Sequence, residues 1–230
     1  MANLDLLMIT HNRLEYLKKA LPNVLNQTHK SINLVIWDND SREDTKEWLK
    51  KQNVKVFFNW DNESLASVTS RVFKKSSSEF VGKVDSDMIL TPDWAERLIK
   101  KHQEFHYGFL GGFHFMPEDL DGIGPIVKNG VWEKKHIGGQ FIIRREDFKG
   151  YDGDGVMGLS EYQEALGLSN GYLFDPVLWV EHMEDKRSKH YIGNSEYNDY
   201  KLKTRGISLE KYQTGIVNRN YLNENTSQKS

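Results

Sequence analysis

Short apolar runs alternate with amphipathic patterns through the first hundred residues, and this alternation limits the possible folds more than any other feature of the chain. Residues 4–9 have the sequence LDLLMI, which is typical of a strand whose sheet is covered on both faces. Further strands are expected at 33–37, 54–58 and 80–84, and amphipathic helices at 13–26, 43–51 and 65–73. Strands that alternate with helices form βαβ units, so we expect an α/β protein with a mostly parallel central sheet flanked by helices.

Two prolines refine this expectation. Thr91-Pro92-Asp93 is a typical helix start, because it combines a capping residue, a proline at the first helical position and an acid in the first turn. Pro22 lies inside the pattern of residues 13–26 and is expected to kink or split that helix near its end.

The regular alternation weakens in the second half of the chain. Further strands are expected at 108–115, 137–143 and 173–180, with glycine-rich loops at 121–125 and 151–155. A chain of 230 residues fits one domain. We therefore expect two halves of one domain, residues 1–104 and 105–192, and a C-terminal extension, residues 193–230, with a flexible end.

The composition excludes several classes of function. There is no cysteine, which excludes thiol catalysis, cysteine-ligated zinc and disulfides and is compatible with a reducing cytoplasm. The net charge of −2 gives no global reason to bind nucleic acid or an anionic membrane. The sequence contains neither the pattern of a signal peptide nor an apolar run of the roughly 20 residues that a membrane span needs. We therefore expect a soluble, cytoplasmic protein.

Polar clusters follow three of the predicted strands. They are Thr10-His11-Asn12-Arg13, Asp38-Asn39-Asp40-Ser41 and Asp85-Ser86-Asp87. Ligands of parallel α/β sheets bind outside the carboxyl ends of the strands, so the three clusters predict a binding site at one edge of the sheet. The alternative is that these segments are ordinary polar loops.

Among four Asp-x-Asp pairs in the chain, where about one is expected by chance, the pair Asp85/Asp87 is distinctive. An apolar strand precedes it, and Met88-Ile89-Leu90 follows at once. Two carboxylates just past a strand can form an oxygen site for Mg²⁺ or Mn²⁺, and the ion can hold a diphosphate. The alternative is a loop of solvated acids.

The order of these motifs resembles the nucleotide-binding half of GT-A glycosyltransferases of the family 2 type. The resemblance covers about residues 4–100 and rests on the segments Thr10-His11-Asn12-Arg13, Leu25-Asn26-Gln27-Thr28, Val35 to Ser41 with Thr45, and Val84-Asp85-Ser86-Asp87 with Pro92. It implies a Rossmann-like nucleotide-diphospho-sugar transferase fold, with the donor in the first half and the acceptor in the second. Asn39 departs from the pattern, because the family usually has a second Asp there.

The resemblance also implies roles for individual residues. Thr10, His11 and Asn12 would line the nucleotide pocket, and Asp38 would accept from the base or the ribose. Asp85, with Ser86 beside it, would face the ribose or the sugar, and Asp87 would ligate the metal. Arg71 and Lys83 would lie near the donor diphosphate, although an ordinary surface arginine is the alternative for Arg71.

The second half resembles the family more loosely. Gly138-Gly139-Gln140 is similar to a segment that contacts the donor sugar, with Gly139 allowing close approach of the backbone. Residues 158–163 resemble the G-x-E-D element that supplies the catalytic base. Its usual Asp is missing, so either Glu161 is the base, with Glu164 as the fallback, or Tyr162 occupies that place. The alternative is a solvated helix N-terminus.

His182 follows the predicted strand 173–180 and, by the resemblance, completes the metal site with Asp87. A nitrogen and a carboxylate ligand suit Mn²⁺, with Mg²⁺ as the alternative ion. His182, Glu184 and His190 could also form a two-histidine, one-carboxylate iron site. We reject that interpretation because it leaves the N-terminal motifs unexplained.

The resemblance implies a metal-dependent, inverting transfer of a sugar from a nucleotide-diphosphate sugar, a UDP-sugar for preference, to a hydroxyl acceptor. The acceptor stays open: a saccharide, a lipid-linked sugar, a protein side chain or a modified nucleic acid. The oligomeric state stays open as well. One alternative is a non-catalytic module that binds a nucleotide sugar or a glycan. A sugar-nucleotide pyrophosphorylase is disfavoured, because the loop after the first strand contains no glycine.

Overall fold

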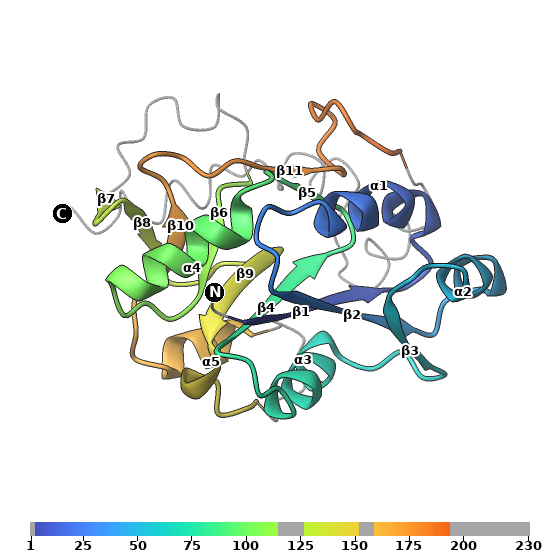
Figure 1. The fold of residues 1–230 in the computed structure, drawn as a ribbon, viewed down its shortest axis with the longest axis horizontal. Coiled ribbons are helices and arrows are strands. Elements are labelled where there is room, and N and C mark those ends of the chain that lie inside the picture. The colour runs from blue at the N-terminus through green and yellow to red at the C-terminus, as the bar shows by residue number, and fades with distance from the viewer. Residues whose placement is uncertain (1–2, 115–126, 152–158, 194–230) are drawn as a thin grey trace.

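The computed structural model describes residues 3–114, 127–151 and 159–193. Its main sheet has nine strands in the order β3-β2-β1-β4-β9-β6-β10-β8-β7 (Figure 1). The first four strands in that order are parallel to one another. They are β1 (Leu4–Thr10), β2 (Ile32–Asn39), β3 (Lys55–Asn59) and β4 (Phe80–Asp85).

The second half of the sheet is mixed. Strand β9 (Gln140–Arg144) pairs antiparallel with β4, and β10 (Asn170–Leu173) pairs parallel with β6 (Leu110–Gly112). The antiparallel strands β8 (Val131–Lys134) and β7 (Val127–Lys128) complete the edge. A separate two-stranded ribbon joins β5 (Met88–Leu90) to β11 (Val180–His182).

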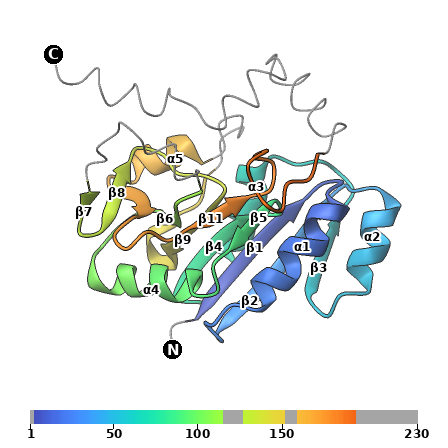
Figure 2. The same cartoon turned by 90° about the horizontal axis from the view of Figure 1, so that it is seen from above.

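Helices cover both faces of the sheet. Figure 1 shows α1 (Leu14–Leu25) and α4 (Trp94–Glu104) above it, and α3 (Leu65–Lys74) and α5 (Ser160–Ala165) below. Helix α2 (Glu43–Lys50) lies beside α1 in Figure 2. Along β1, Leu6 and Met8 belong to one buried cluster while Leu7 and Ile9 belong to the other. This division explains why the strand has no polar alternation.

The predicted α/β fold is confirmed, and the strands and helices of residues 4–104 lie close to the ranges that the sequence predicts. The single strand predicted at 173–180 is wrong. Strand β10 ends at Leu173 and β11 begins at Val180. Pro176 lies in the turn between them, and it has no backbone N–H to donate to a neighbouring strand.

The expected split of the first helix is also wrong, because α1 runs through Pro22 to Leu25. Pro22 stands in the last turn, where its missing N–H deprives only the carbonyl of Lys18, an exposed residue. The loop at 121–125, most of the loop at 151–155 and nearly all of the C-terminal extension lie outside the described residues. In the described ranges, no helix combines the length and the apolar character needed to cross a membrane.

Candidate functional site

The three polar clusters predicted to follow strands meet at one edge of the sheet. In the register, Thr10 is opposite Asp38 on β2, and Ile9 is opposite Asp85 on β4. The loops after β1, β2 and β4 are therefore neighbours, as expected for a ligand site at the carboxyl ends of parallel strands.

His11 and Asn12 form a fixed hydrogen-bond chain in the loop after β1. The Asn12 Oδ1 accepts from the backbone N–H of Arg42 at 2.6 Å, so the Asn12 Nδ2 faces His11 Nε2 at 3.1 Å. His11 Nε2 therefore accepts, and the Nδ1–H donates to the carbonyl of Asn39 at 2.8 Å. Asn12 itself has a φ of +54°, which asparagine tolerates better than most residues. The chain joins the loops after β1 and β2.

Asp38 is the most deeply buried acid at this edge, with an exposed fraction of 0%. Among the described residues no donor meets full hydrogen-bond geometry at either of its carboxylate oxygens, although Ser41 lies close enough to act on them. Burial raises the pKa of Asp38, and the neighbouring Ser41 and Lys46 counter part of that rise. A buried carboxylate whose oxygens are not fully hydrogen-bonded is costly, so this acid is suited to accept from a ligand.

Asn39, the departure from the family pattern, ties the loop after β3 to β2. Its Nδ2 donates to Asn62 Oδ1 at 2.7 Å and to the carbonyl of Glu63 at 2.9 Å. A carboxylate could make neither bond because it has no donor. Arg71 in turn donates to the two carboxylate oxygens of Glu63 through Nη1 and Nη2. The guanidinium predicted to touch the diphosphate is therefore engaged by Glu63.

Asp85 and Lys83 form an ion pair at the same edge of the sheet. The Lys83 ammonium donates to Asp85 Oδ1, and the Lys83 side chain is 8% exposed against 34% for Asp85. The Asp85 N–H donates to the carbonyl of Gly139 at 2.7 Å. Gly139 has a φ of +79°, and a Cβ there would collide with the Met88 side chain. Position 139 thus requires glycine, and Lys83 reaches the site through Asp85.

Asp87, His182 and Glu184 form the candidate metal centre. Each offers a ligand atom, and these atoms lie within 4.8 Å of one another. The β5–β11 ribbon brings them together, since His182 is opposite Met88 and the Met183 N–H donates to the carbonyl of Asp87 at 2.8 Å. The predicted ligands Asp87 and His182 are thus close in space. Glu184 is a third member of the cluster that was not predicted as a ligand of this site.

Arg13 is buried between the two carboxylates of this centre. It donates to Asp87 Oδ2, and to Glu184 Oε1 at 2.7 Å, and its guanidinium lies 4.9 Å from the centroid of the Tyr16 ring. Two carboxylates and one guanidinium leave one negative charge. A divalent cation would be attracted by that remaining charge.

The donor set of the centre fits the ion that the sequence predicts. Two carboxylates and an imidazole are oxygen and nitrogen donors of the kind that Mn²⁺ accepts. His182 Nδ1 accepts from the Glu184 N–H at 3.2 Å, and His182 Nε2 lies 3.8 Å from Asp87 Oδ2. Desolvation lowers the pKa of the neighbouring His114 to about 3, with a further contribution from His182. His190 pairs instead with Glu181 at 2.9 Å, away from this centre.

Helix α5 carries the two candidate bases in different surroundings. Glu161 is exposed, and its Oε2 accepts from the Tyr151 hydroxyl at 2.6 Å. Glu164 is bonded by Lys135 and His136, and these bonds lower its pKa. Gly158, the first residue of the predicted base element, lies outside the described residues.

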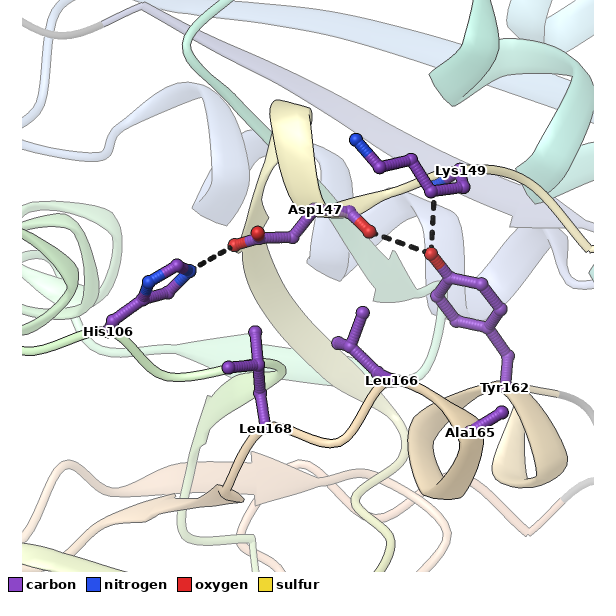
Figure 3. Close-up of a pocket in the computed structure, with 7 residues that line it drawn as sticks. All are labelled: His106, Asp147, Lys149, Tyr162, Ala165, Leu166 and Leu168. Atoms are coloured by element: carbon purple, nitrogen blue, oxygen red, sulfur yellow. Dashed lines mark hydrogen bonds and ion pairs between the residues drawn. The ribbon is translucent and has the colours of Figure 1, made fainter.

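Two other side chains anchor α5. Gln163 accepts from the Ile137 N–H and donates to the Ile137 carbonyl, both at 2.8 Å, two residues before Gly139. The Tyr162 hydroxyl donates to the carbonyl of Asp147 and accepts from the N–H of Lys149, both at 2.8 Å (Figure 3). Tyr162 is therefore a structural anchor, and α5 is joined directly to the glycine segment at the site.

A pocket of about 420 Å³ lies beside Tyr162, with His106 on its opposite side (Figure 3). Asp147, which lines the pocket, comes three residues after Arg144, the last residue of β9. Arg144 is opposite Phe80, and Phe80 is the first residue of β4, whereas Asp85 is the last. The pocket therefore lies toward the edge of the sheet opposite Asp85. His106 and Asp147 are already paired at 2.9 Å, and the Tyr162 hydroxyl has both of its partners. Nothing in this pocket requires a ligand.

A sequence pattern that includes Glu184 is present, but it is the pattern considered for iron. In that pattern His182 and Glu184 were grouped with His190. The structure places Glu184 in the cluster with Asp87 and His182, whereas His190 pairs with Glu181. Arg13 was part of the first motif without an assigned role. No local pattern shows that its partners lie 74 and 171 residues further along the chain.

The chain is similar in sequence to known glycosyltransferases. The model of the family described as Glycosyl transferase family 2 matches residues 5–157. A glycosyltransferase of Rickettsia bellii is 28% identical over 111 residues, which are 47% of this chain and 16% of the relative. The glycosyltransferase GlyA of Streptococcus pneumoniae is 25% identical over 117 residues, 49% of this chain and 17% of the relative. The chain thus matches only a small part of the length of these relatives.

Two solved structures share the fold. TarS of S. aureus, residues 1–349, in complex with UDP-GlcNAc, is 16% identical with a TM-score of 0.60, covering 86% of this chain and 64% of that chain. The mannosyltransferase PcManGT of Pyrobaculum calidifontis, in complex with GDP-Man and Mn²⁺, is 14% identical with a TM-score of 0.61, covering 88% of this chain and 61% of that chain. These likenesses confirm the predicted GT-A type of fold.

Proposed function

Because the chain belongs to glycosyl transferase family 2, whose model matches residues 5–157, we propose that it transfers a sugar from a nucleotide-diphosphate sugar to a hydroxyl acceptor. We propose a UDP-sugar as the donor. The observation that carries the proposal is that the buried acid Asp38 on β2 and Asp87 after β4 lie at the same edge of one sheet, where the β5–β11 ribbon brings His182 and Glu184 to Asp87. The UDP-GlcNAc complex of TarS and the GDP-Man complex of PcManGT support this class of donor.

The first half of the chain, residues 1–104, would hold the donor. Asp38 would accept a hydrogen bond from the base, and the loop of Thr10, His11 and Asn12 would line the nucleotide pocket. Asp85 would contact the ribose or the sugar, with its carboxylate oriented by Lys83. Ser86 is buried in the same turn and Gly139 lies beside it, so the backbone there can approach the sugar closely.

Asp87 and His182 would hold Mn²⁺ or Mg²⁺, with Glu184 as a third ligand. When bound, the ion would neutralise the charge that develops on the leaving diphosphate. Arg13 would keep the carboxylates of Asp87 and Glu184 oriented, because its planar guanidinium donates to both.

The second half, residues 105–192, would hold the acceptor and the base. Glu161 would take the proton of the acceptor hydroxyl while that oxygen attacks the anomeric carbon, and this single displacement inverts the anomeric configuration. The Tyr151 hydroxyl would orient Glu161 through its 2.6 Å hydrogen bond. Glu164 is the weaker candidate, since the bonds that lower its pKa make it a poorer base.

A panel of nucleotide sugars with and without Mn²⁺ tests the proposal, first by thermal shift and then by turnover. We expect a UDP-sugar to stabilise the protein in a Mn²⁺-dependent way and to be transferred or hydrolysed. Glu161→Gln should bind the same donor and lose about 100-fold or more in turnover. If the wild type and Glu161→Gln both bind a nucleotide sugar and neither turns it over, the chain is a non-catalytic binding module. The missing Asp of the base element favours that alternative.

A further inference from the structure

Strand β3 forms one edge of the nine-stranded sheet, and its outer side pairs with no strand of the described ranges (Figure 1). Proteins often protect a sheet edge by making the edge strand very short. The opposite edge follows this rule, because β7 has two residues, whereas β3 has five. Strand β3 is therefore long enough to serve as a template for a further strand.

The hydrogen bonds between β2 and β3 show which backbone groups of β3 face outward. The carbonyl of Asn59 accepts from the N–H of Asp40 at 3.0 Å, so Asn59 directs its backbone groups toward β2. These directions alternate along a strand, and the N–H and C=O groups of Val56 and Phe58 therefore point away from the sheet. They are the donors and acceptors that a further strand would use.

Aromatic side chains are exposed along the same edge. Phe57 is 42% exposed, and Trp60, one residue beyond the strand, is 72% exposed. The Phe57 ring contacts Trp37 on β2, with 5.7 Å between the ring centroids. Aromatic residues are enriched in the cores of protein interfaces, so this edge is suited to be covered by another protein surface.

The charges on β3 favour a second copy of this chain as the partner. Lys55 is exposed at the beginning of the strand, and Asp61 is exposed two residues after its end. When two copies of one strand pair antiparallel about a two-fold axis, the beginning of each strand lies beside the end of the other. Lys55 of each copy would then lie near Asp61 of the other, and opposite charges on neighbouring strands stabilise their pairing.

Helix α2 shows the same complementarity next to β3. It lies over the face of the strand that carries Phe58, since Lys50 Nζ is 5.9 Å from the centroid of that ring. Asp44 is exposed in the first turn of α2, and Lys51 is exposed directly after its last residue. The same two-fold axis would make the two α2 helices antiparallel, so the acidic beginning of each helix would lie toward the basic end of the other.

We propose that the protein forms a two-fold symmetric dimer in which the β3 strands of two copies pair antiparallel about Phe57. In this register Val56 of each copy exchanges both of its backbone hydrogen bonds with Phe58 of the other. The two Phe57 residues face each other in a non-hydrogen-bonded pair, where opposite side chains are closest. The two nine-stranded sheets become one continuous sheet, and the carboxyl ends of their parallel strands point in opposite directions.

Sedimentation equilibrium of the full chain tests the proposal. We expect the wild type to be a dimer at about 10 μM. Phe57→Lys should raise the dissociation constant at least about tenfold, because it places two ammonium groups opposite each other at the axis. Phe105→Lys is the matched control, since Phe105 is 38% exposed and lies at the end of α4, away from β3. It should leave the dissociation constant unchanged.

An exchange of charges supplies a second test that does not depend on the folding of Phe57→Lys. Lys55→Asp should raise the dissociation constant about fivefold, because it places an acid near Asp61 of the other copy. The double variant Lys55→Asp/Asp61→Lys should restore the wild-type value, since the opposite charges have then changed places. A wild type that stays monomeric at about 100 μM overturns the inference. So does a dimer that Phe57→Lys leaves intact, or a double variant as weak as Lys55→Asp.

Discussion

Arg13 and Asp87 form a buried ion pair that joins the loop after β1 to the loop after β4. Both side chains are 6% exposed, and the second arm of the Arg13 guanidinium reaches Glu184, which is 3% exposed. The three charges come from the beginning of α1, the turn before β5 and the residues after β11. One arginine thus holds three distant segments of the candidate metal centre together, and the centre depends on it.

We predict that Arg13→Met destabilises the fold by about 3 kcal/mol, because two buried carboxylates lose their counter-charge. Urea unfolding at pH 7 measures this free energy. Lys18→Met is the control, since Lys18 lies on the helix that Arg13 precedes, is exposed, and among the described residues pairs with Glu15 at the surface. A loss below about 1 kcal/mol for Arg13→Met would show that water already screens the pair.

We predict that Asp87→Ala abolishes the Mn²⁺ dependence of UDP binding. Asp87 contributes a ligand atom to the only three-residue cluster of this kind that was found among the described residues. Calorimetry of UDP with and without Mn²⁺ measures the effect, and Asp61→Ala serves as an exposed control. An unchanged Mn²⁺-dependent affinity in Asp87→Ala would contradict the metal assignment.

Asp38→Ala should weaken UDP by about tenfold while its response to Mn²⁺ stays the same, because Asp38 accepts from the base rather than from the ion. The variant should unfold at no lower temperature than the wild type, since burial disfavours the Asp38 carboxylate and raises its pKa. Calorimetry and a melting curve check the two parts. A wild-type affinity for UDP would place the base pocket elsewhere.

Asn39→Asp, which restores the residue usual in the family, should destabilise this protein by about 1–3 kcal/mol. The new carboxylate would face Asn62 Oδ1 and the carbonyl of Glu63, two acceptors that now receive the Asn39 amide. Urea unfolding of Asn39→Asp measures the loss against the exposed control Asn53→Asp. Equal stability of the two variants would mean that the loop after β3 rearranges without cost.

His102 should make stability fall with acid. Burial lowers its pKa from 6.5 to about 4, and its Nε2 donates to the carbonyl of Ile142 at 3.0 Å. Between these two pKa values the unfolded chain binds the proton and the folded chain does not. Stability is therefore complete above pH 6.5 and declines by about 3 kcal/mol as the pH falls to 4.

Urea unfolding at a series of pH values tests this titration. His102→Gln should lose that part of the acid dependence, while His106→Gln, which replaces an exposed histidine on the same segment, should retain it. An identical acid limb in the wild type and His102→Gln would assign the dependence to other groups.

The sequence by itself was enough to predict the first half of the fold. The apolar runs at β1 to β4 and the amphipathic patterns of α1 to α4 are local, because a covered strand and a half-buried helix each need a characteristic spacing of apolar residues. The polar residues after β1, β2 and β4 could also be placed at one edge, since parallel strands end on the same side. Asp38, Asp87 and the neighbours of Thr10 follow from that rule.

Only the tertiary structure decided which distant side chains meet at this edge. The β5–β11 ribbon brings His182 and Glu184 to Asp87, and Arg13 pairs across 74 and 171 residues of chain. Asn39 could be recognised as a departure, but its partners in the loop after β3 could not. Periodicity records which face of an element is buried, whereas the identity of the partner depends on the packing of the whole chain.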